Sequence, residues 1–259
     1  MKTLHFLFLL FSLNTFTFSQ GLFPHPHAHS HNDYERIRPL KNALQNGFIS
    51  VEADVHLQNG NLLVSHHHPN KKAPSLEKLY LAPLDSLLHA NSGQVYRGYA
   101  GPFYLMIDCK TEARTTYRSI RNLIAKFPAL LCSSGNCPVK IFLSGNRPVQ
   151  EMVSEGYSGI GIDGRPNDLG KGYSSELMPV ISDHFRNWST WNGKSKPSQD
   201  DLMRIKGLVQ RVHAEGKKLR LWAIPDHEET WTALLEAGVD FINTDHLQEL
   251  NHFLTRNRL

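Results

Sequence analysis

The amino-acid sequence predicts an α/β fold, a single (β/α)8 TIM barrel. Its 259 residues are close to the ~250 that one such barrel needs. Short apolar strand patterns alternate with helical patterns along the chain, which is typical of parallel strands joined by crossover helices. Eight strand patterns can be counted, the number that closes this barrel. With 40% hydrophobic and 20% charged residues, the chain has ample material for a core.

The expected strands are short runs bounded by turn-forming residues. They cover residues 28–30, 49–57, 103–109, 139–143, 159–162, 179–182, 218–223 and 241–244. Helices are expected at 39–45, 113–127, 149–155, 199–215 and 228–237, with a short closing helix at 247–254. Gly47, Gly216 and Gly238 stand where helix C-caps are expected. Loop-rich insertions are expected at 71–83, 168–177 and 187–197. Since no linker or internal repeat interrupts this rhythm, residues 20–259 are predicted to form one domain.

Residues 1–19 are predicted to be a signal peptide. Lys2 precedes an apolar run at 4–13, and small residues at 17–19 suit a signal peptidase, with Gln20 as the first mature residue. The alternative is an uncleaved membrane anchor, although the run is short for a span of about 20 residues. We therefore expect a secreted or periplasmic protein.

Export changes how the three cysteines are interpreted. Cys132 and Cys137 bracket a Ser/Gly/Asn turn and are predicted to form a disulfide in an oxidising compartment. Two free loop thiols are the alternative in a reducing compartment. Cys109 is expected to be a buried small hydrophobe.

The net charge of +4 is mild and slightly favours anionic substrates. No basic run with interleaved aromatic residues is present, so no nucleic-acid partner is expected. We expect a monomer.

The strand at 49–57 carries unusual chemistry for a buried strand. Glu52, Asp54 and His56 alternate with apolar residues and therefore share one face. Two adjacent carboxylates stay buried only if a cation or several donors offset their repulsion and desolvation. The strand therefore predicts a site for a hard divalent metal ion, Ca²⁺ or Mg²⁺.

Several segments carry a family resemblance. The segments SHNDY at 30–34, GFISVEADV at 47–55 and NGNLLVSH at 59–66 resemble the phospholipase C-like phosphodiesterase superfamily. This superfamily includes glycerophosphodiester phosphodiesterases, phosphatidylinositol-specific phospholipases C and sphingomyelinase D enzymes. Within it, the chain most resembles the altered-inheritance-of-mitochondria proteins. FYLMIDCKT at 103–111, LRLWA at 219–223 and GVDFINTD at 238–245 are similar to further family segments, in the same order.

The resemblance implies a TIM barrel of the phospholipase C-like type and a metal-dependent phosphoric diester hydrolase. It implies that His31 and His66 form an acid/base pair, while Lys110 contacts the phosphate oxygens. One divalent metal ion would be held by Asn32, Glu52, Asp54 and Asp108. Alternatives remain open: Asn32 could cap the following turn, Asp108 could form a plain salt bridge with Lys110, and His67 could take the role of His66.

Further candidates follow strands at their carboxyl ends, where the loops of such barrels build the active site. Asp183, Trp222 and Asp245 are assigned to substrate binding on this ground, and His29 is added because it lies two residues before His31. The expected partner is a small-molecule or lipid phosphodiester, and a lipid would bring contact with a membrane surface. A Ca²⁺ or Mg²⁺ ion fits all-oxygen ligands equally well.

Two other classes of function are considered. The pair His29-x-His31 also resembles the zinc ligands of amidohydrolase barrels, but that function predicts zinc ligands at the fifth and sixth strands. The fifth strand ends in GIDG at 161–164 without a histidine, and His184 lies beyond Asp183. A catalytically inactive secreted lipid- or sugar-binding barrel predicts gaps in the set of catalytic and metal-binding residues, and its five core positions are all filled.

Overall fold

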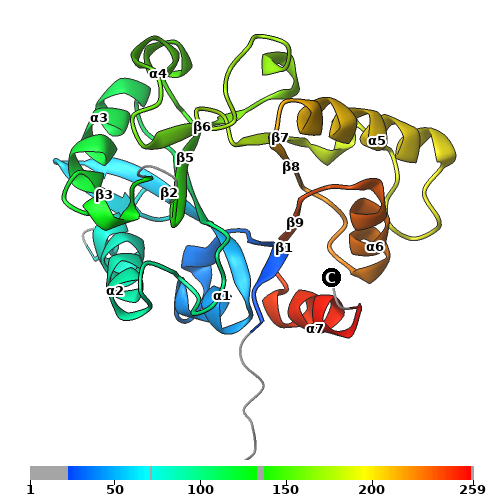
Figure 1. Ribbon diagram of the computed structural model, residues 1–259, viewed down its shortest axis with the longest axis horizontal. Helices are drawn as coiled ribbons and strands as arrows, with labels where there is room; N and C mark the ends of the chain where they lie inside the picture. Colours follow the sequence, from blue (N-terminus) through cyan, green and yellow to red (C-terminus); the bar gives the residue numbers. More distant parts are fainter. Residues whose placement is uncertain (1–22, 71, 133–136, 258–259) are drawn as a thin grey trace, which may run out of the picture.

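Eight parallel strands close into a barrel in the computed structural model, which describes residues 23–70, 72–132 and 137–257. The strands are β1 (His25–Ser30), β2 (Phe48–Gln58), β4 (Phe103–Cys109), β5 (Val139–Gly145), β6 (Ile160–Gly164), β7 (Val180–His184), β8 (Lys218–Trp222) and β9 (Phe241–Thr244). Their order is β1-β9-β8-β7-β6-β5-β4-β2, and β1 also pairs with β2, so the ring is complete. Figure 1 shows β1 and β9, from opposite ends of the chain, side by side. The predicted TIM barrel is confirmed.

A ninth strand, β3 (Asn61–Val64), adds to β2 as an antiparallel hairpin. The turn uses Asn59 and Gly60, both at positive φ (50° and 78°), as a two-residue hairpin turn of the primed type requires. The hairpin brings the chain back along β2, where the Ser65 amide donates to the Asp54 carbonyl (3.1 Å). Residue 66 is thereby returned to the strand that carries the predicted carboxylates.

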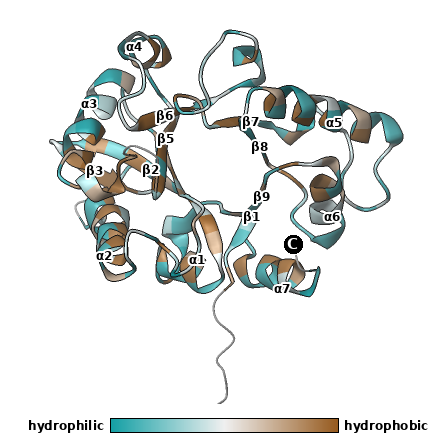
Figure 2. Cartoon of the chain, viewed as in Figure 1, coloured by the Kyte–Doolittle hydropathy of each residue, from teal (hydrophilic) through white to brown (hydrophobic). Residues whose placement is uncertain are grey.

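In residues 23–70, 72–132 and 137–257, seven α-helices are present, and they surround the strands (Figure 1). They are α1 (Lys41–Gln45), α2 (Ala82–Ala90), α3 (Ala113–Ile124), α4 (Val149–Glu155), α5 (Gln199–Ala214), α6 (Glu228–Ala237) and α7 (Leu247–Asn257). Helix α3 shows why they pack this way: Tyr117, Ile120 and Ile124 recur at helical spacing and are buried. Figure 2 shows largely hydrophobic strands β6 and β7, and helices that combine hydrophobic and hydrophilic stretches. The apolar core therefore lies between the strands and the helices.

One expectation about local structure was wrong. The predicted loop at 71–83 is helical from Glu77 onward, as a π-helical turn (Glu77–Leu81) that leads into α2. Leu76, Tyr80 and Leu84 recur every four residues and are buried, and Pro83 lies where the π-helical turn passes into α2. The loop predicted at 168–177 is present: among the described residues the connection from β6 to β7 contains only a short 3-10 turn (Pro166–Asp168), so β6 is not followed by an α-helix of its own.

The cysteines agree with their expected roles. Cys132 and Cys137 form a disulfide, and Cys109 is free and buried. Burial raises the pKa of the Cys109 thiol to about 12. The predicted signal peptide lies outside the described residues. Among the residues that are described, no helix combines the length and apolar character needed to cross a bilayer.

Candidate active site

Three buried or half-buried carboxylates meet inside the barrel at the carboxyl ends of β2 and β4. Oxygen atoms of Glu52, Asp54 and Asp108 all lie within 4.8 Å of one another. The sheet register causes this meeting, because Asp54 and Asp108 are paired positions on neighbouring strands and Glu52 shares the face of Asp54. These three predicted ligands therefore form a cluster that could hold a metal ion.

The fourth predicted ligand, Asn32, is tied to this cluster through a tyrosine. Asn32 adopts the left-handed conformation (φ 45°), which asparagine tolerates well, and makes no side-chain cap. The Tyr34 hydroxyl lies 2.8 Å from Asn32 Oδ1 and 2.8 Å from Asp54 Oδ2. Burial and the Asp54 charge raise the pKa of Tyr34, so its hydroxyl keeps its proton. Tyr34 was not predicted as a site residue, although it closes the SHNDY segment.

The protein supplies fewer cations than carboxylates at this cluster. Lys110 Nζ lies 3.0 Å from Asp54 Oδ2 and 3.0 Å from Asp108 Oδ2. Burial raises the pKa of Asp108, and the charges of Glu52 and Asp54 add to this effect against the opposing charge of Lys110. The Oδ1 atoms of Asp54 and Asp108 are buried and have no hydrogen-bond partner among the described residues. Orphaned, buried carboxylate oxygens are the ligands that a hard cation takes, so this donor set fits a divalent metal ion.

Arg220 on β8 is a site residue that the sequence analysis missed. Its Nη2 lies 3.1 Å from Glu52 Oε2, and its Nε donates to Asn243 Oδ1 (2.9 Å). Burial opposes the charge of Glu52, but the Arg220 guanidinium together with His29 and His31 outweighs burial and lowers the pKa of Glu52 to about 2. The sequence did carry a signal for Arg220: it is a charged residue in the apolar strand KLRLW and lies on the same face as Trp222.

His31 follows β1 and is held by a carboxylate from the end of β9. Its Nδ1 lies 3.2 Å from both carboxylate oxygens of Asp245, and Arg36 Nη2 lies 2.7 Å from Asp245 Oδ1. Burial disfavours the charged imidazole, but the hydrogen bond to Asp245 and the charges of Glu52 and Asp245 outweigh it and raise the pKa of His31. The same hydrogen bond lowers the pKa of Asp245. Asp245, predicted to contact substrate, thus orients a histidine here and raises its pKa.

His66 follows the hairpin and contacts the cluster at Asp54. Its Nδ1 lies 3.1 Å from Asp54 Oδ2 and 3.1 Å from the Tyr34 hydroxyl. The neighbouring His67 packs edge-on against His66, with ring centroids 4.8 Å apart. Of these two histidines, His66 is the one that contacts Asp54.

The remaining predicted residues lie at the same end of the barrel. Trp222 is 38% exposed, and its ring packs against His184 with centroids 4.2 Å apart. His29 is fully buried beside Glu52, and burial, with the nearby Arg220 charge, lowers the pKa of His29 to about 4. Both oxygens of Asp183 accept hydrogen bonds within its own loop, so its substrate contact remains a prediction.

The structure gives little support to the zinc alternative. Asp163, at the end of β6 where that function requires a ligand, accepts hydrogen bonds from Ser144 and Ser182 and pairs with Arg165. On the next strand, β7, His184 Nδ1 accepts a hydrogen bond from the Arg186 amide in its own loop. Within the described part of the chain, the three carboxylates are the group with metal-ligand spacing.

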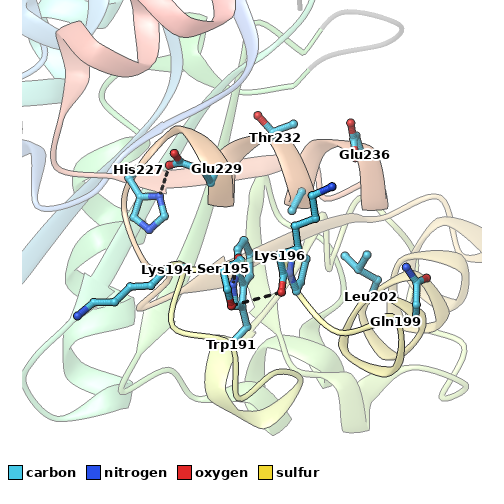
Figure 3. A pocket seen from close by; sticks show the side chains of 13 residues that line it. Trp191, Lys194, Ser195, Lys196, Gln199, Leu202, His227, Glu229, Thr232 and Glu236 are labelled. Carbon is cyan, nitrogen blue, oxygen red and sulfur yellow. Dashed lines mark hydrogen bonds and ion pairs between the residues drawn. The ribbon is translucent and has the colours of Figure 1, made fainter.

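A cavity of about 880 Å³ lies elsewhere, between the 191–197 loop, α5 and α6 (Figure 3). Lys194 and Lys196 lie on its loop side, and Glu229 and Glu236 lie on α6. None of the predicted site residues lines it. We therefore place the candidate active site at the carboxylate cluster and not in this cavity.

Comparisons with known proteins agree with the geometry. A family model described as the AIM6-like phosphodiesterase domain matches residues 17–130, and one described as the glycerophosphoryl diester phosphodiesterase family matches 218–248. The chain is 29% identical to altered inheritance of mitochondria protein 6 of Eremothecium gossypii, covering 86% of this chain and 68% of that protein. It is 28% identical to the Kluyveromyces lactis protein of the same name (86% and 70% covered). A homolog from Arthroderma benhamiae is 27% identical (83% and 79% covered). The resemblance predicted from the sequence is confirmed.

Proposed function

We propose that this protein is a metal-dependent phosphoric diester hydrolase that uses His31 and His66 for acid/base catalysis. The observation that carries the proposal is the pair of orphaned carboxylate oxygens, on Asp54 and Asp108, in a cluster that His66 and Lys110 also contact. The matches to phosphodiesterase families at 17–130 and 218–248 support the same reaction class.

One divalent ion, Ca²⁺ or Mg²⁺, would be held by Glu52, Asp54 and Asp108, with Asn32 as a further oxygen donor. When bound, the ion would neutralise negative charge on the phosphate oxygens, which otherwise repels a nucleophile. Lys110 would add a second positive charge for the same oxygens, since its ammonium already lies beside two of the carboxylates.

Proton transfer would fall to the two histidines. One imidazole must be neutral to take the proton of the attacking hydroxyl or water, and the other must be charged to protonate the leaving alkoxide. Asp245 orients His31 through Nδ1, so its Nε2 is left for the substrate. Asp54 and Tyr34 hold His66 through Nδ1 in the same manner.

The substrate would be a small-molecule or lipid phosphodiester, with Trp222 as an exposed aromatic contact at the barrel mouth. Export would suit this activity. The Cys132–Cys137 disulfide supports an oxidising compartment, as does the apolar run expected to act as a signal peptide.

An activity screen tests the proposal. The mature chain would be assayed against glycerophosphodiesters, lysophospholipids, sphingomyelin and phosphatidylinositol, each with Mg²⁺, Ca²⁺ or EDTA. We expect turnover of at least one class that requires a divalent ion and stops in EDTA. Silence across the panel would contradict the proposal and favour a lipid- or sugar-binding barrel.

A further inference from the structure

Two arginines at the carboxyl ends of β5 and β6 have no part in the proposed reaction. Arg147 lies in the loop after β5, and Arg165 directly follows β6. The loop of Arg147 is joined to the end of β4, because the Asn146 amide donates to the Cys109 carbonyl (2.8 Å). Gly145 packs so closely on Asp108 that no side chain would fit there. Arg147 therefore lies near Asp108, and Arg165 lies near Arg147, close enough for their charges to interact.

Arg165 has a counter-ion within the protein. Its Nη1 lies 2.8 Å from Asp163 Oδ2. Asp163 is fully buried and is itself held by the Ser144 hydroxyl (2.8 Å) and the Ser182 hydroxyl (2.6 Å). This network fixes the Arg165 guanidinium, which stays about one-third exposed at the barrel mouth.

Arg147 has no such counter-ion. In the part of the chain that the structure describes, no carboxylate forms an ion pair with it, and its Nη1 donates only to the Gly145 carbonyl (3.0 Å). Its Nε is buried and has no hydrogen-bond partner among the residues that the structure describes. Burial and the neighbouring charge of Arg165 lower the pKa of Arg147. A half-buried guanidinium with an orphaned donor is costly unless an anion completes it.

We propose that Arg147, with Arg165 beside it, binds a second anionic group of the substrate, a carboxylate or phosphate carried by one alcohol of the scissile diester. A guanidinium suits such a group, because its forked donors pair with two oxygens of an oxyanion. The inference rests on the proposed function and deepens it. The scissile phosphate would lie at the cluster of β2 and β4, and the substrate would extend toward β5 and β6.

Matched pairs of diesters test this subsite by binding. Glycerophosphoserine differs from glycerophosphoethanolamine by one carboxylate, and glycerophosphoinositol 4-phosphate differs from glycerophosphoinositol by one phosphate. Calorimetry with Mg²⁺ would use the His66→Ala protein, in which turnover should be too slow to consume the diester during the titration. We expect the more anionic member of at least one pair to bind about ten-fold more tightly, and the preferred pair identifies the group.

Variants test whether Arg147 causes the preference for the more anionic diester. Arg147→Gln in the same background should abolish the preference, and Arg147→Lys should retain part of it because the charge stays but the fork is lost. Arg118→Gln is the matched control, since Arg118 is exposed on α3 and pairs with Glu151. Thermal melts verify that each variant is folded.

Equal binding of both members of each pair, or a preference that survives in Arg147→Gln, would overturn the subsite. The reaction is judged separately, with His66 intact. Hydrolysis of both members at similar rates would leave the proposed reaction standing without the subsite. A preference that depends on Arg147, without hydrolysis of either diester, would keep the subsite and contradict the reaction.

Discussion

The carboxylates on the β2–β4 side of the barrel mouth and those on the β6–β9 side differ in how completely their oxygens are bonded. Asp54 and Asp108 each keep one buried oxygen that has no partner in the described part of the chain. Asp163 and Asp226, which also follow or end parallel strands, use both oxygens on donors of the protein. The same residue type at comparable positions thus has two different surroundings.

The difference indicates two tasks. A buried carboxylate stays charged only when donors or cations offset its desolvation. On the β6–β9 side the fold supplies all of these donors, as when Asp226 binds the Trp231 indole, the Thr244 hydroxyl and the Asp245 amide. On the β2–β4 side the fold leaves a deficit that a metal ion would fill. The β6–β9 side, where Asp163 and Asp226 have both oxygens bonded by the protein, is the saturated side and shapes loops. The β2–β4 side, where Asp54 and Asp108 keep oxygens that no described residue bonds, is the unsaturated side and would bind the metal and catalyse the reaction.

The largest expected effect comes from a histidine on the unsaturated side. His66→Ala should lower turnover by about 10²–10⁴, because a positioned acid or base is lost. Metal affinity should be nearly unchanged, since the carboxylates remain. Steady-state kinetics and calorimetry on the same preparation measure both quantities. His67→Ala is the control, and an equal loss of turnover in that variant would mean that the wrong histidine has been chosen.

A smaller effect is expected where the two sides meet, at Asp245 and His31. Asp245→Asn should lower turnover by roughly 10-fold to 100-fold, as the orienting hydrogen bond weakens. Because Asp245 raises the pKa of His31, the variant should also move one limb of the bell-shaped pH profile to lower pH. A shifted alkaline limb would identify His31 as the acid, and a shifted acidic limb would identify it as the base. An unmoved profile would show that Asp245 does not act through His31.

The smallest effect on activity is expected from the saturated side. Asp163→Asn should lower the free energy of unfolding by about 1–3 kcal/mol. Arg165 loses its counter-ion, and an amide has one oxygen in place of the two that accept hydrogen bonds from Ser144 and Ser182. Its metal affinity should equal that of the wild type. Chemical denaturation measures the first quantity. A variant that is fully stable but has lost metal would reverse the distinction between the two sides.

The sequence predicted the strands and most of the cluster because their signals are local. Period-two alternation places Glu52 and Asp54 on one face, and strand order places Asp108 beside them. Arg220 was missed because its partner Glu52 lies 168 positions away in sequence, and only the closed barrel brings them together. Asp245 was predicted as a site residue but was assigned to substrate binding. Its role beside His31 was missed for the same reason, because the contact joins residues that follow the last and the first strands.

Helix α2 was missed for a different reason. Pro83 and the preceding polar residues indicated a loop, while the buried leucines at helical spacing indicated a helix, and packing decided for the helix. The orphaned oxygens are also invisible in the sequence. Asp54 and Asp163 look alike as letters, and only their neighbours in space distinguish them.

Metal titration of two matched variants tests the central claim most directly. Calorimetry would compare the wild type with Asp54→Asn and Asp163→Asn, each with Mg²⁺ and with Ca²⁺. We predict one ion bound by the wild type and by Asp163→Asn, and at least ten-fold weaker binding by Asp54→Asn, because a charged ligand has become an amide. Equal metal affinity in a folded Asp54→Asn protein and the wild type would contradict the account.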